Sequence, residues 1–502
     1  MSLMKRSNIE LRANPNRVMC RIFVPGDEDL IRGASRADGV IQRCMLLTEA
    51  KVDEILKQTI ASFEPRHRDL IAQFELHFAA VAGLIPDGET ITGNRKLLIG
   101  AYLTQEYAFE ATAYFNPSMV LHPDQTGVAE GCVRFIMSVR AVGEGHISSI
   151  VFRTGIVTAS GEVDVDAEPI HATTVAKRYG ILRNKFVMQL VIEAGLDTED
   201  LALVLGMLPD KFSLEEFEVS LAQIHVMREG RLNTELILEK LRDITRSSYE
   251  VDFAAETELT ERVLWPTVAS ERHGMEDARW VKVLEPDGSN CYRATYTGFD
   301  GQQVCSRVLE TTDFRRFTSM ELTGPSVANK GVAFFPRQVG GKYMALSRWD
   351  RETNSITTSD DGYHWNDSHT FQEALRPWEL VQIGNAGSPL ETEAGWLVIT
   401  HGAGPMREYT LGAVLLDLED PRIVRAMLPV PLLTPAADER NGYVPNVIYS
   451  CGGLIHNGIL ILPYGFSDSG TRFATVAVSE LLAQMKPVDV VASANDQPLH
   501  TV

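Results

Sequence analysis

Five polar side chains stand near the ends of five short apolar runs, and their types suit the binding of a polar or anionic ligand. Arginine, histidine and tyrosine donate hydrogen bonds to oxygen-rich groups, and the planar guanidinium matches phosphate and carboxylate. Such groups are costly to bury unless they share partners or a ligand. Their recurrence favours one common polar funnel; the alternative is satisfied surface groups on unrelated strands. The five residues are Arg140, Tyr296, Arg348, His401 and Tyr464.

The runs that carry these residues share one pattern, in which strand-forming residues lead to a polar residue and then to a small or turn residue. The last four copies recur about every 50–60 residues, which is the spacing of propeller blades. This spacing predicts an all-β fold, a five-bladed β-propeller, whose radial repetition brings the five side chains to the central axis. The runs cover residues 134–141, 291–298, 343–349, 396–402 and 459–465.

Two stretches, 48–82 and 176–244, instead have apolar residues at helical spacing. In the second, Ser213 and Glu216 form an S-x-x-E capping box, which marks a helix start. The flanking aromatic residues, Phe212 and Phe217, are placed to act as a hydrophobic staple.

These stretches predict helices added to the propeller at its N-terminus and after its first blade. The simplest hypothesis is that they pack on each other as one lobe, which caps the funnel or forms a homo-oligomer interface; the alternative is solvent-facing decoration. The expected division is an N-terminal helical segment at 1–90, the first part of the propeller at 91–175, a helical insertion at 176–262 and the remaining propeller at 263–490.

The overall composition excludes several classes of partner. The 502 residues include 67 acidic and 47 basic side chains, a formal net charge of −20. Such an acidic surface repels nucleic acid and anionic membranes. No apolar run approaches the roughly 18 residues that a membrane helix requires. Six cysteines without a C-x-x-C pair, and an N-terminus without a secretory apolar region, predict a cytoplasmic location.

Short sequence words, in a fixed order, resemble those of glycoside hydrolase family 130, the β-mannoside phosphorylases and related mannosidases. They extend over about three-quarters of the chain, although the helical stretches match nothing in the short members of the family. Each word is weak alone, but their common order is specific. The words include residues 115–118, 139–141, 274–279, 329–330 with 335–336, 341–348, 395–402, 415–421, 445–447 and 464–468.

The resemblance implies inverting attack by inorganic phosphate on a β-manno-oligosaccharide, giving mannose 1-phosphate and an acceptor sugar. It implies that Asp277 is the general acid, because the leaving oxygen of such a reaction needs a proton. No cofactor is implied, and none of the 12 histidines falls in a metal-binding H-x-x-x-H pair. The implied phosphate-binding residues are Arg140, Lys330, Arg348, His401 and Tyr409, and the expected sugar-binding residues are Glu110, Asn116, Tyr296, Tyr464 and Asp468.

The sequence also departs from the family pattern. Gly331 follows Asn329-Lys330 where many family phosphorylases have aspartate. An incomplete phosphate site would favour the alternative of an inverting β-mannosidase that uses water and paired glutamates, for which Glu271 and Glu276 are the candidates. A third alternative is a non-catalytic sugar-binding propeller, because a fold does not guarantee a function.

Overall fold

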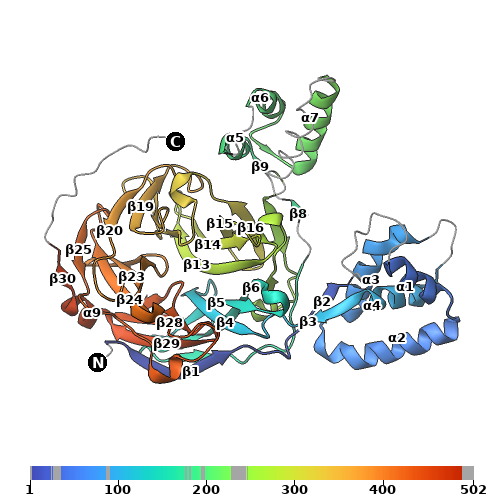
Figure 1. The fold of residues 1–502 in the computed structure, drawn as a ribbon, viewed down its shortest axis with the longest axis horizontal. Helices are drawn as coiled ribbons and strands as arrows, with labels where there is room; N and C mark the ends of the chain where they lie inside the picture. Colours follow the sequence, from blue (N-terminus) through green and yellow to red (C-terminus); the bar gives the residue numbers. More distant parts are fainter. Residues whose placement is uncertain are drawn as a thin grey trace.

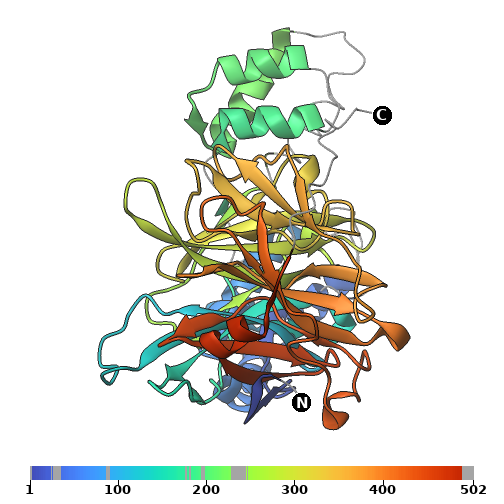
Figure 2. The same cartoon turned by 90° about the vertical axis from the view of Figure 1, so that its left-hand side faces the viewer.

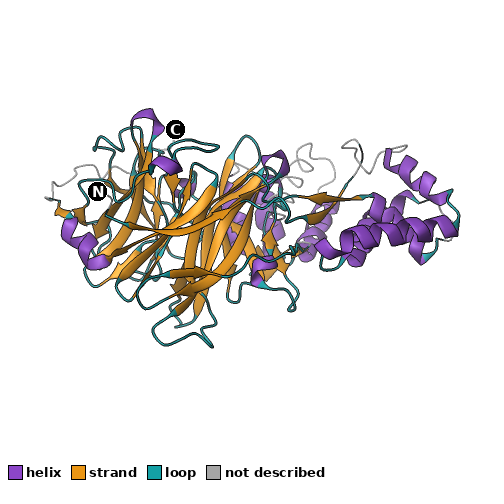
Figure 3. Cartoon of the chain, turned by 90° about the horizontal axis from the view of Figure 1, so that it is seen from below, coloured by secondary structure: helices purple, strands orange, loops and turns teal. Residues whose placement is uncertain are grey.

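The computed structural model describes residues 3–23, 25, 36–85, 91–175, 178–179, 182–193, 198–227, 245 and 247–488. The body of the protein is predominantly β (Figure 3), and most of the helices project from it in two groups (Figure 1). Its sheets follow one another around the body in chain order, from β4 in cyan to β29 in red (Figure 1). All five runs identified in the sequence form strands or contain one.

The first and largest sheet has eleven strands and contains two antiparallel meanders, which meet where Gly274 pairs with Ser148 in parallel. None of the sheets in the described residues closes on itself. The strands of this sheet are β4 (Ala113–Leu121), β5 (Val133–Val142), β6 (Ser148–Val157), β7 (Val163–Val165), β8 (Arg178–Tyr179), β11 (Tyr249–Asp252), β12 (Val263–Leu264), β13 (Gly274–Leu284), β14 (Asn290–Phe299), β15 (Val304–Thr311) and β16 (Arg316–Glu321).

Three smaller sheets complete the ring of β-structure. The four-stranded sheet has β17 (Ala333–Phe334), β18 (Tyr343–Ser347), β19 (Asn354–Ser359) and β20 (His369–Gln372). The six-stranded sheet has β21 (Gln382–Asn385), β22 (Leu390–Thr392), β23 (Gly395–Ala403), β24 (Tyr409–Leu416), β25 (Val424–Met427) and β30 (Lys486–Pro487). The five-stranded sheet has β1 (Lys5–Arg12), β26 (Ile448–Tyr449), β27 (Leu454–His456), β28 (Ile459–Phe466) and β29 (Gly470–Ala477).

Strand β23 shows why these apolar runs become central strands. Successive side chains of a strand point to opposite faces. Trp396 and Val398 accordingly enter one hydrophobic core, shared with the preceding sheet, whereas Leu397 and Ile399 enter another, shared with the following sheet. Both faces of the strand are therefore buried, which explains an unbroken apolar sequence.

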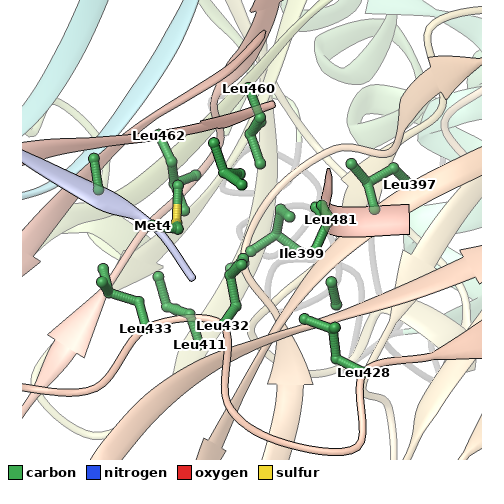
Figure 4. Packing of buried hydrophobic residues seen from close by; sticks show 14 of the residues in the cluster. Met4, Leu397, Ile399, Leu411, Leu428, Leu432, Leu433, Leu460, Leu462 and Leu481 are labelled. Atoms are coloured by element: carbon green, nitrogen blue, oxygen red, sulfur yellow. The ribbon is translucent and has the colours of Figure 1, made fainter. Parts of the chain in front are cut away.

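The N-terminal strand β1 joins the last sheet, where it pairs antiparallel with β29. Met4, just before β1, packs among leucines of β28 and β24, including Leu462 and Leu411 (Figure 4). Burial of each such side chain stabilises the fold by about 1.5–3 kcal/mol. The first strand of the chain is thus held in the same sheet as β28 and β29.

The N-terminal helices form a bundle at one side of the body, next to a two-stranded ribbon of β2 (Met19–Ile22) and β3 (Thr104–Tyr107) (Figure 1). Thr48, the first residue of the predicted stretch, caps α2 by accepting a hydrogen bond from the Lys51 amide. The helices are α1 (Arg36–Met45), α2 (Glu49–Phe63), α3 (Leu70–Val81) and α4 (Gly93–Tyr102).

The second group contains α5 (Asn184–Glu193), α6 (Thr198–Gly206) and α7 (Leu214–Met227), beside the short pair β9 (Leu182–Arg183) and β10 (Lys211–Phe212). The predicted capping box is present: the Ser213 amide donates to Glu216 Oε2 at 2.7 Å, and the Glu216 amide donates to Ser213 Oγ at 3.2 Å. The Phe212 and Phe217 rings stack with centroids 5.8 Å apart, as the staple requires. The remainder of the predicted stretch, 228–244, lies outside the described residues.

The prediction that the two helical groups pack on each other as one lobe is wrong. Helices α5–α7 enclose their own core, which includes Leu205, Phe217 and Leu221. Helices α1–α4 enclose separate cores, and the two groups leave the body at different places (Figures 1 and 2). Each apolar face is covered within its own group.

The cysteines and the helix lengths bear on the expectations drawn from composition. All six cysteines are free thiols. Among the described helices, including the short C-terminal α9 (Val478–Gln484), none combines the length and apolarity needed to cross a membrane.

Candidate active site

Two β-bulges place an amide and a carboxylate side by side. The register of β4 shifts between Phe115 and Ser118, and that of β13 shifts between Glu276 and Arg279. Within these bulges Asn116 and Asp277 have positive φ values of 52° and 57°. Asn116 Nδ2 donates a hydrogen bond of 2.7 Å to Asp277 Oδ1. Bulges re-aim side chains, and non-glycine residues with positive φ concentrate at functional sites.

Asn116 and Asp277 line a cavity of about 260 Å³. Eight residues singled out in the sequence line this cavity together, although they come from all four of the larger sheets and their connecting loops. They are Asn116, Arg140, Asp277, Lys330, Arg348, His401, Tyr409 and Asp468. The remaining lining residues are Phe115, Arg279, Gln382, Arg407, Val444, Val447 and Tyr449.

Glu276 lies next to the cavity and is held by two cations. Arg140 Nη2 donates to Glu276 Oε1 at 2.7 Å, and Lys330 Nζ donates to Glu276 Oε2 at 2.6 Å. Arg140 also reaches Asp277 Oδ1 at 3.4 Å, and its Nε donates to Ser148 Oγ at 2.9 Å. Both carboxylate oxygens of Glu276 are thus engaged, and Arg140 orients the two neighbouring carboxylates at once.

The two aspartates of the cavity have pKa values displaced in opposite directions. Burial opposes ionisation of Asp277, but the charges of Arg140, Arg279 and Lys330 outweigh it, so the pKa of Asp277 lies below its ordinary value. Burial, reinforced by the negative charge of Asp277, raises the pKa of Asp468 to about 6, against the opposing charge of Arg140. Carboxyl groups separated in this way can hold different protonation states at one pH.

One wall of the cavity presents buried donors without partners. Arg348 Nε and Arg279 Nε have no hydrogen-bond partner within the described residues, and neither has either ring nitrogen of His401. Burial, together with the charges of Arg348 and Arg279, holds the pKa of His401 well below its ordinary value, so its ring is neutral. An unmade buried hydrogen bond costs about 1–3 kcal/mol. This wall is therefore suited to a ligand rich in acceptor oxygens.

Tyrosines and a glycine shape this wall. The His401 ring stacks on Tyr409 with centroids 6.0 Å apart, and Arg279 Nη2 donates to the Tyr449 hydroxyl at 2.8 Å. A Cβ at Gly384 would lie 2.3 Å from His401 Cε1 and 2.7 Å from Arg348 Cδ, so only glycine fits between them. At Gly331, the position that departs from the family word, a Cβ would lie 3.3 Å from Arg348 Cδ.

Three residues expected to bind sugar lie outside the cavity lining, because each is enclosed by partners in the interior. Arg17 Nη1 donates to both carboxylate oxygens of Glu110 at 3.0 Å, and Glu110 is fully buried. The Tyr296 hydroxyl donates to Glu271. The Tyr464 hydroxyl donates to Glu439 Oε1 at 2.6 Å.

Glu271, expected to help activate water in a hydrolase, is likewise absent from the lining. Its carboxylate accepts hydrogen bonds from the Tyr249 hydroxyl at 3.0 Å and the Thr267 amide at 2.9 Å, and Arg307 Nε lies 3.1 Å away. Glu271 and Glu276 therefore do not form a pair that faces one water.

Several lining residues were not assigned a role from the sequence. Arg279 belongs to a recognised word, and Tyr449 follows the word at 445–447 by two residues, so both carried a signal. Arg407 had none: it reaches the cavity from a hairpin turn at a positive φ of 56°. Across the described ranges, no three His, Cys, Asp or Glu side chains are grouped so that they could hold a metal ion.

Residues 227–487 match the model of the family described as beta-1,4-mannooligosaccharide phosphorylase. A 1,2-beta-oligomannan phosphorylase of Thermoanaerobacter sp. (strain X514) is 34% identical over 224 residues, which are 42% of this chain and 71% of that protein. A beta-1,2-mannobiose phosphorylase of Listeria innocua is 32% identical over 233 residues, 44% of this chain and 63% of that protein. The solved structure of a Listeria innocua beta-1,2-mannobiose phosphorylase with beta-1,2-mannobiose has a TM-score of 0.43 at 20% identity, covering 74% and 92% of the two chains.

Proposed function

The chain belongs to glycoside hydrolase family 130, and from that premise we propose that it is a phosphorylase that cleaves a β-mannoside with inorganic phosphate. One observation carries the proposal: Asp277 shares its cavity with a wall of cationic and unpartnered donors. A chain with a net charge of −20 needs such a local cluster to attract an anion. The names of relatives, which are phosphorylases of β-mannosides, support the same reaction.

The phosphate is proposed to bind against Arg348, Arg279 and His401, with Tyr409 and Lys330 beside it. Arginine forks match phosphate oxygens bidentately, and charge-assisted hydrogen bonds are about twice as strong as neutral ones. The neutral His401 ring can add one donor without further positive charge. Arg140 is reassigned from this set, because its guanidinium contacts two carboxylates, Glu276 and Asp277, whereas Lys330 contacts Glu276 alone.

Asp277 is proposed to be the general acid. Burial would raise its pKa, but Arg140, Arg279 and Lys330 lower it below its ordinary value, which favours the ionised carboxylate. A bound phosphate dianion offsets these cations, and a nearby negative charge raises the pKa of a carboxyl group. Binding of phosphate therefore prepares Asp277 to carry the proton that the leaving sugar needs.

In the reaction a phosphate oxygen attacks C1 of the mannosyl unit while the bond from C1 to the acceptor oxygen breaks. The electron pair of that bond passes to the acceptor oxygen, which receives the proton from Asp277, through a hydroxyl of the substrate as the family resemblance implies. Attack from the opposite face inverts C1 and gives α-mannose 1-phosphate. Asn116 and Asp468 are proposed to bind sugar hydroxyls.

We also propose a five-bladed propeller as the architecture of the β-body, with the two meanders of the eleven-stranded sheet as separate blades. The proposed division keeps the ranges 1–90, 91–175, 176–262 and 263–490, although β1 of the first range and β11 of the third pair with strands of the β-body. A cytoplasmic location is proposed because free thiols suit a reducing compartment.

The test is cleavage of β-1,2- and β-1,4-mannobiose with and without phosphate, with the products separated by chromatography. The proposal expects turnover only with phosphate and a sugar phosphate among the products. Equal release of free mannose in phosphate-free buffer would contradict it and indicate the hydrolase.

A further inference from the structure

An exposed pair of aromatic rings includes Tyr443, the sequence neighbour of the cavity-lining residue Val444. His146 and Tyr443 stack with centroids 5.8 Å apart and an interplanar angle of 29°. Tyr443 is nevertheless 66% exposed. An exposed aromatic face that is fixed in place is a typical platform for a ring-shaped ligand with an apolar face.

Tyr443 is tied to the part of the cavity that holds Asp468. The Tyr443 amide donates to Ser469 Oγ at 3.3 Å, and the amide of Val444, a lining residue, donates to the Ser467 carbonyl at 3.1 Å. The Ser467 amide in turn donates to the Val447 carbonyl at 2.7 Å. The tyrosine loop and the turn of Asp468 therefore form one cross-linked unit.

His146 comes from a distant part of the chain. It lies in the hairpin turn between β5 and β6, and β5 carries Arg140. The stack thus joins the Tyr443 loop to the β5–β6 hairpin, whose Arg140 contacts the carboxylates of Glu276 and Asp277. The contact with His146 restrains the Tyr443 ring.

Hydrogen bonds and ring contacts separate the two ends of the cavity. At one end the centroid of the His401 ring lies 4.7 Å from that of Tyr449, whose hydroxyl accepts a hydrogen bond from Arg279, and Arg279 Nη1 donates to the Asp277 carbonyl at 3.1 Å. At the other end Asn116, which donates to Asp277, is close to the turn of Asp468, because the Tyr114 amide donates to the Ser469 carbonyl at 3.3 Å. Asp277 therefore lies between the donor wall and Asp468. In an inverting displacement the attacking and leaving groups occupy opposite faces of the sugar. With phosphate at the donor wall, the leaving sugar falls on the side of Asp468 and Tyr443.

We propose that Tyr443, backed by His146, is the stacking platform for the acceptor sugar and determines which acceptors the enzyme accepts. This inference rests on the proposed function, because that function sets which end of the cavity holds phosphate. The apolar C–H face of a pyranose packs on the exposed tyrosine ring while Asp468 and Arg407 face its hydroxyls.

The first test is synthesis from α-mannose 1-phosphate and mannose, followed through phosphate release. Tyr443→Ala should raise the acceptor KM about fivefold or more, the scale of one aromatic contact, while the KM of mannose 1-phosphate changes less than about twofold. Tyr443→Phe should restore the wild-type value, because stacking does not need the hydroxyl. The matched control is Tyr102→Ala, an exposed tyrosine of α4 in the N-terminal bundle. An unchanged acceptor KM in Tyr443→Ala, or a Phe variant as weak as the Ala variant, would overturn the inference.

A binding measurement separates this inference from the proposed function. Calorimetry with β-1,2-mannobiose in phosphate-free buffer should give a Kd about fivefold or more weaker for Tyr443→Ala than for the wild type. If the wild type binds but shows no phosphate-dependent turnover, the proposed function fails and the weaker Kd still supports the platform. If the Kd is the same in both proteins, the platform fails whatever the reaction. If the wild type binds no mannobiose, both are overturned.

Discussion

Asp277 and Asp468 show how one cavity can give the same side chain two roles. Asp277 contacts Asn116 and Arg140, and neighbouring cations favour its ionised form. Asp468 has fewer compensating charges, so burial raises its pKa to about 6. The first is the group that we propose as the general acid, with a proton controlled by bound phosphate, and the second has its pKa raised to about 6.

Replacement of Asp277 tests the assignment of the acid. Asp277→Asn keeps the shape and the position of the side chain but cannot supply the proton, so kcat should fall by about 10²–10⁴-fold. Mannobiose binding, measured by calorimetry, should remain. Asp360→Asn, a change at an exposed aspartate, is the control and should keep full activity. Near wild-type turnover of Asp277→Asn would show that another group is the acid.

Replacement of Arg348 tests whether the cavity wall with unpartnered donors binds phosphate. Hydrogen bonds to charged groups contribute about 1.5–3 kcal/mol, so Arg348→Ala should raise the KM of phosphate about 10–100-fold. The KM of the mannoside should change much less. The control is Arg316→Ala, whose partner is the surface residue Asp252. An unchanged phosphate KM, measured by initial rates over a range of phosphate concentrations, would remove Arg348 from the phosphate site.

The raised pKa of Asp468 predicts that the stability of the fold depends on pH. Its pKa is raised from 3.8 to about 6 in the folded protein, so the folded state binds more protons than the unfolded state between these values. The contribution of Asp468 therefore stabilises the fold at acid pH and is lost as the pH rises through about 6. Relative to the wild type, Asp468→Asn should gain in melting temperature from pH 4.5 to pH 7. The same difference in melting temperature at both pH values would refute the shift.

Eight residues that line the cavity were singled out from the sequence. Glu110, Tyr296 and Tyr464 were also expected there, but they lie outside the lining. A repeated pattern does not determine which strand end faces the axis, because a shift of one residue reverses the side of every side chain. Asp468 illustrates this: it reaches the cavity from the turn after β28, whereas Tyr464 within that strand points to Glu439. Bulges such as that at Asn116 leave no signal in an apolar pattern.

Among the elements, strands and helix starts were predictable because their signals are local. The apolar runs form strands such as β5 and β23, and the capping box at Ser213 begins α7. The packing of the helical groups was not predictable, because an apolar stripe shows that a face is buried but not which partner covers it. Each group instead covers its own stripes.

The self-contained core of α5–α7 predicts a local effect of mutation. Leu221 is fully buried there, so Leu221→Asp should destabilise this group by about 3 kcal/mol through an unpaired buried charge. Turnover at 25 °C should be retained, because no residue of this group lines the cavity. Limited proteolysis should cleave the variant within residues 182–227 faster than the control Val219→Asp, which changes an exposed residue of the same helix. Equal cleavage rates would contradict the packing.

For the whole molecule, the site depends on segments far apart in the chain. Asn116 and Arg140 precede the region matched by the family model, which begins at residue 227, yet they contact Asp277 within it. Strand β1 pairs with β29, and Arg6 donates to Glu439 Oε2 at 2.9 Å, so the N-terminal strand secures the last sheet. The cavity is thus lined by residues from all four of the larger sheets and their connecting loops.

We propose that phosphate, bound against Arg348, attacks the mannosyl carbon opposite Asp277. The most direct test is a ³¹P NMR time course of the purified protein with β-mannobiose and phosphate. The phosphate signal should decrease as the signal of α-mannose 1-phosphate grows, with one equivalent of free sugar released per sugar phosphate. Free mannose accumulating while the phosphate signal stays constant, or the β-anomer of the sugar phosphate, would contradict it.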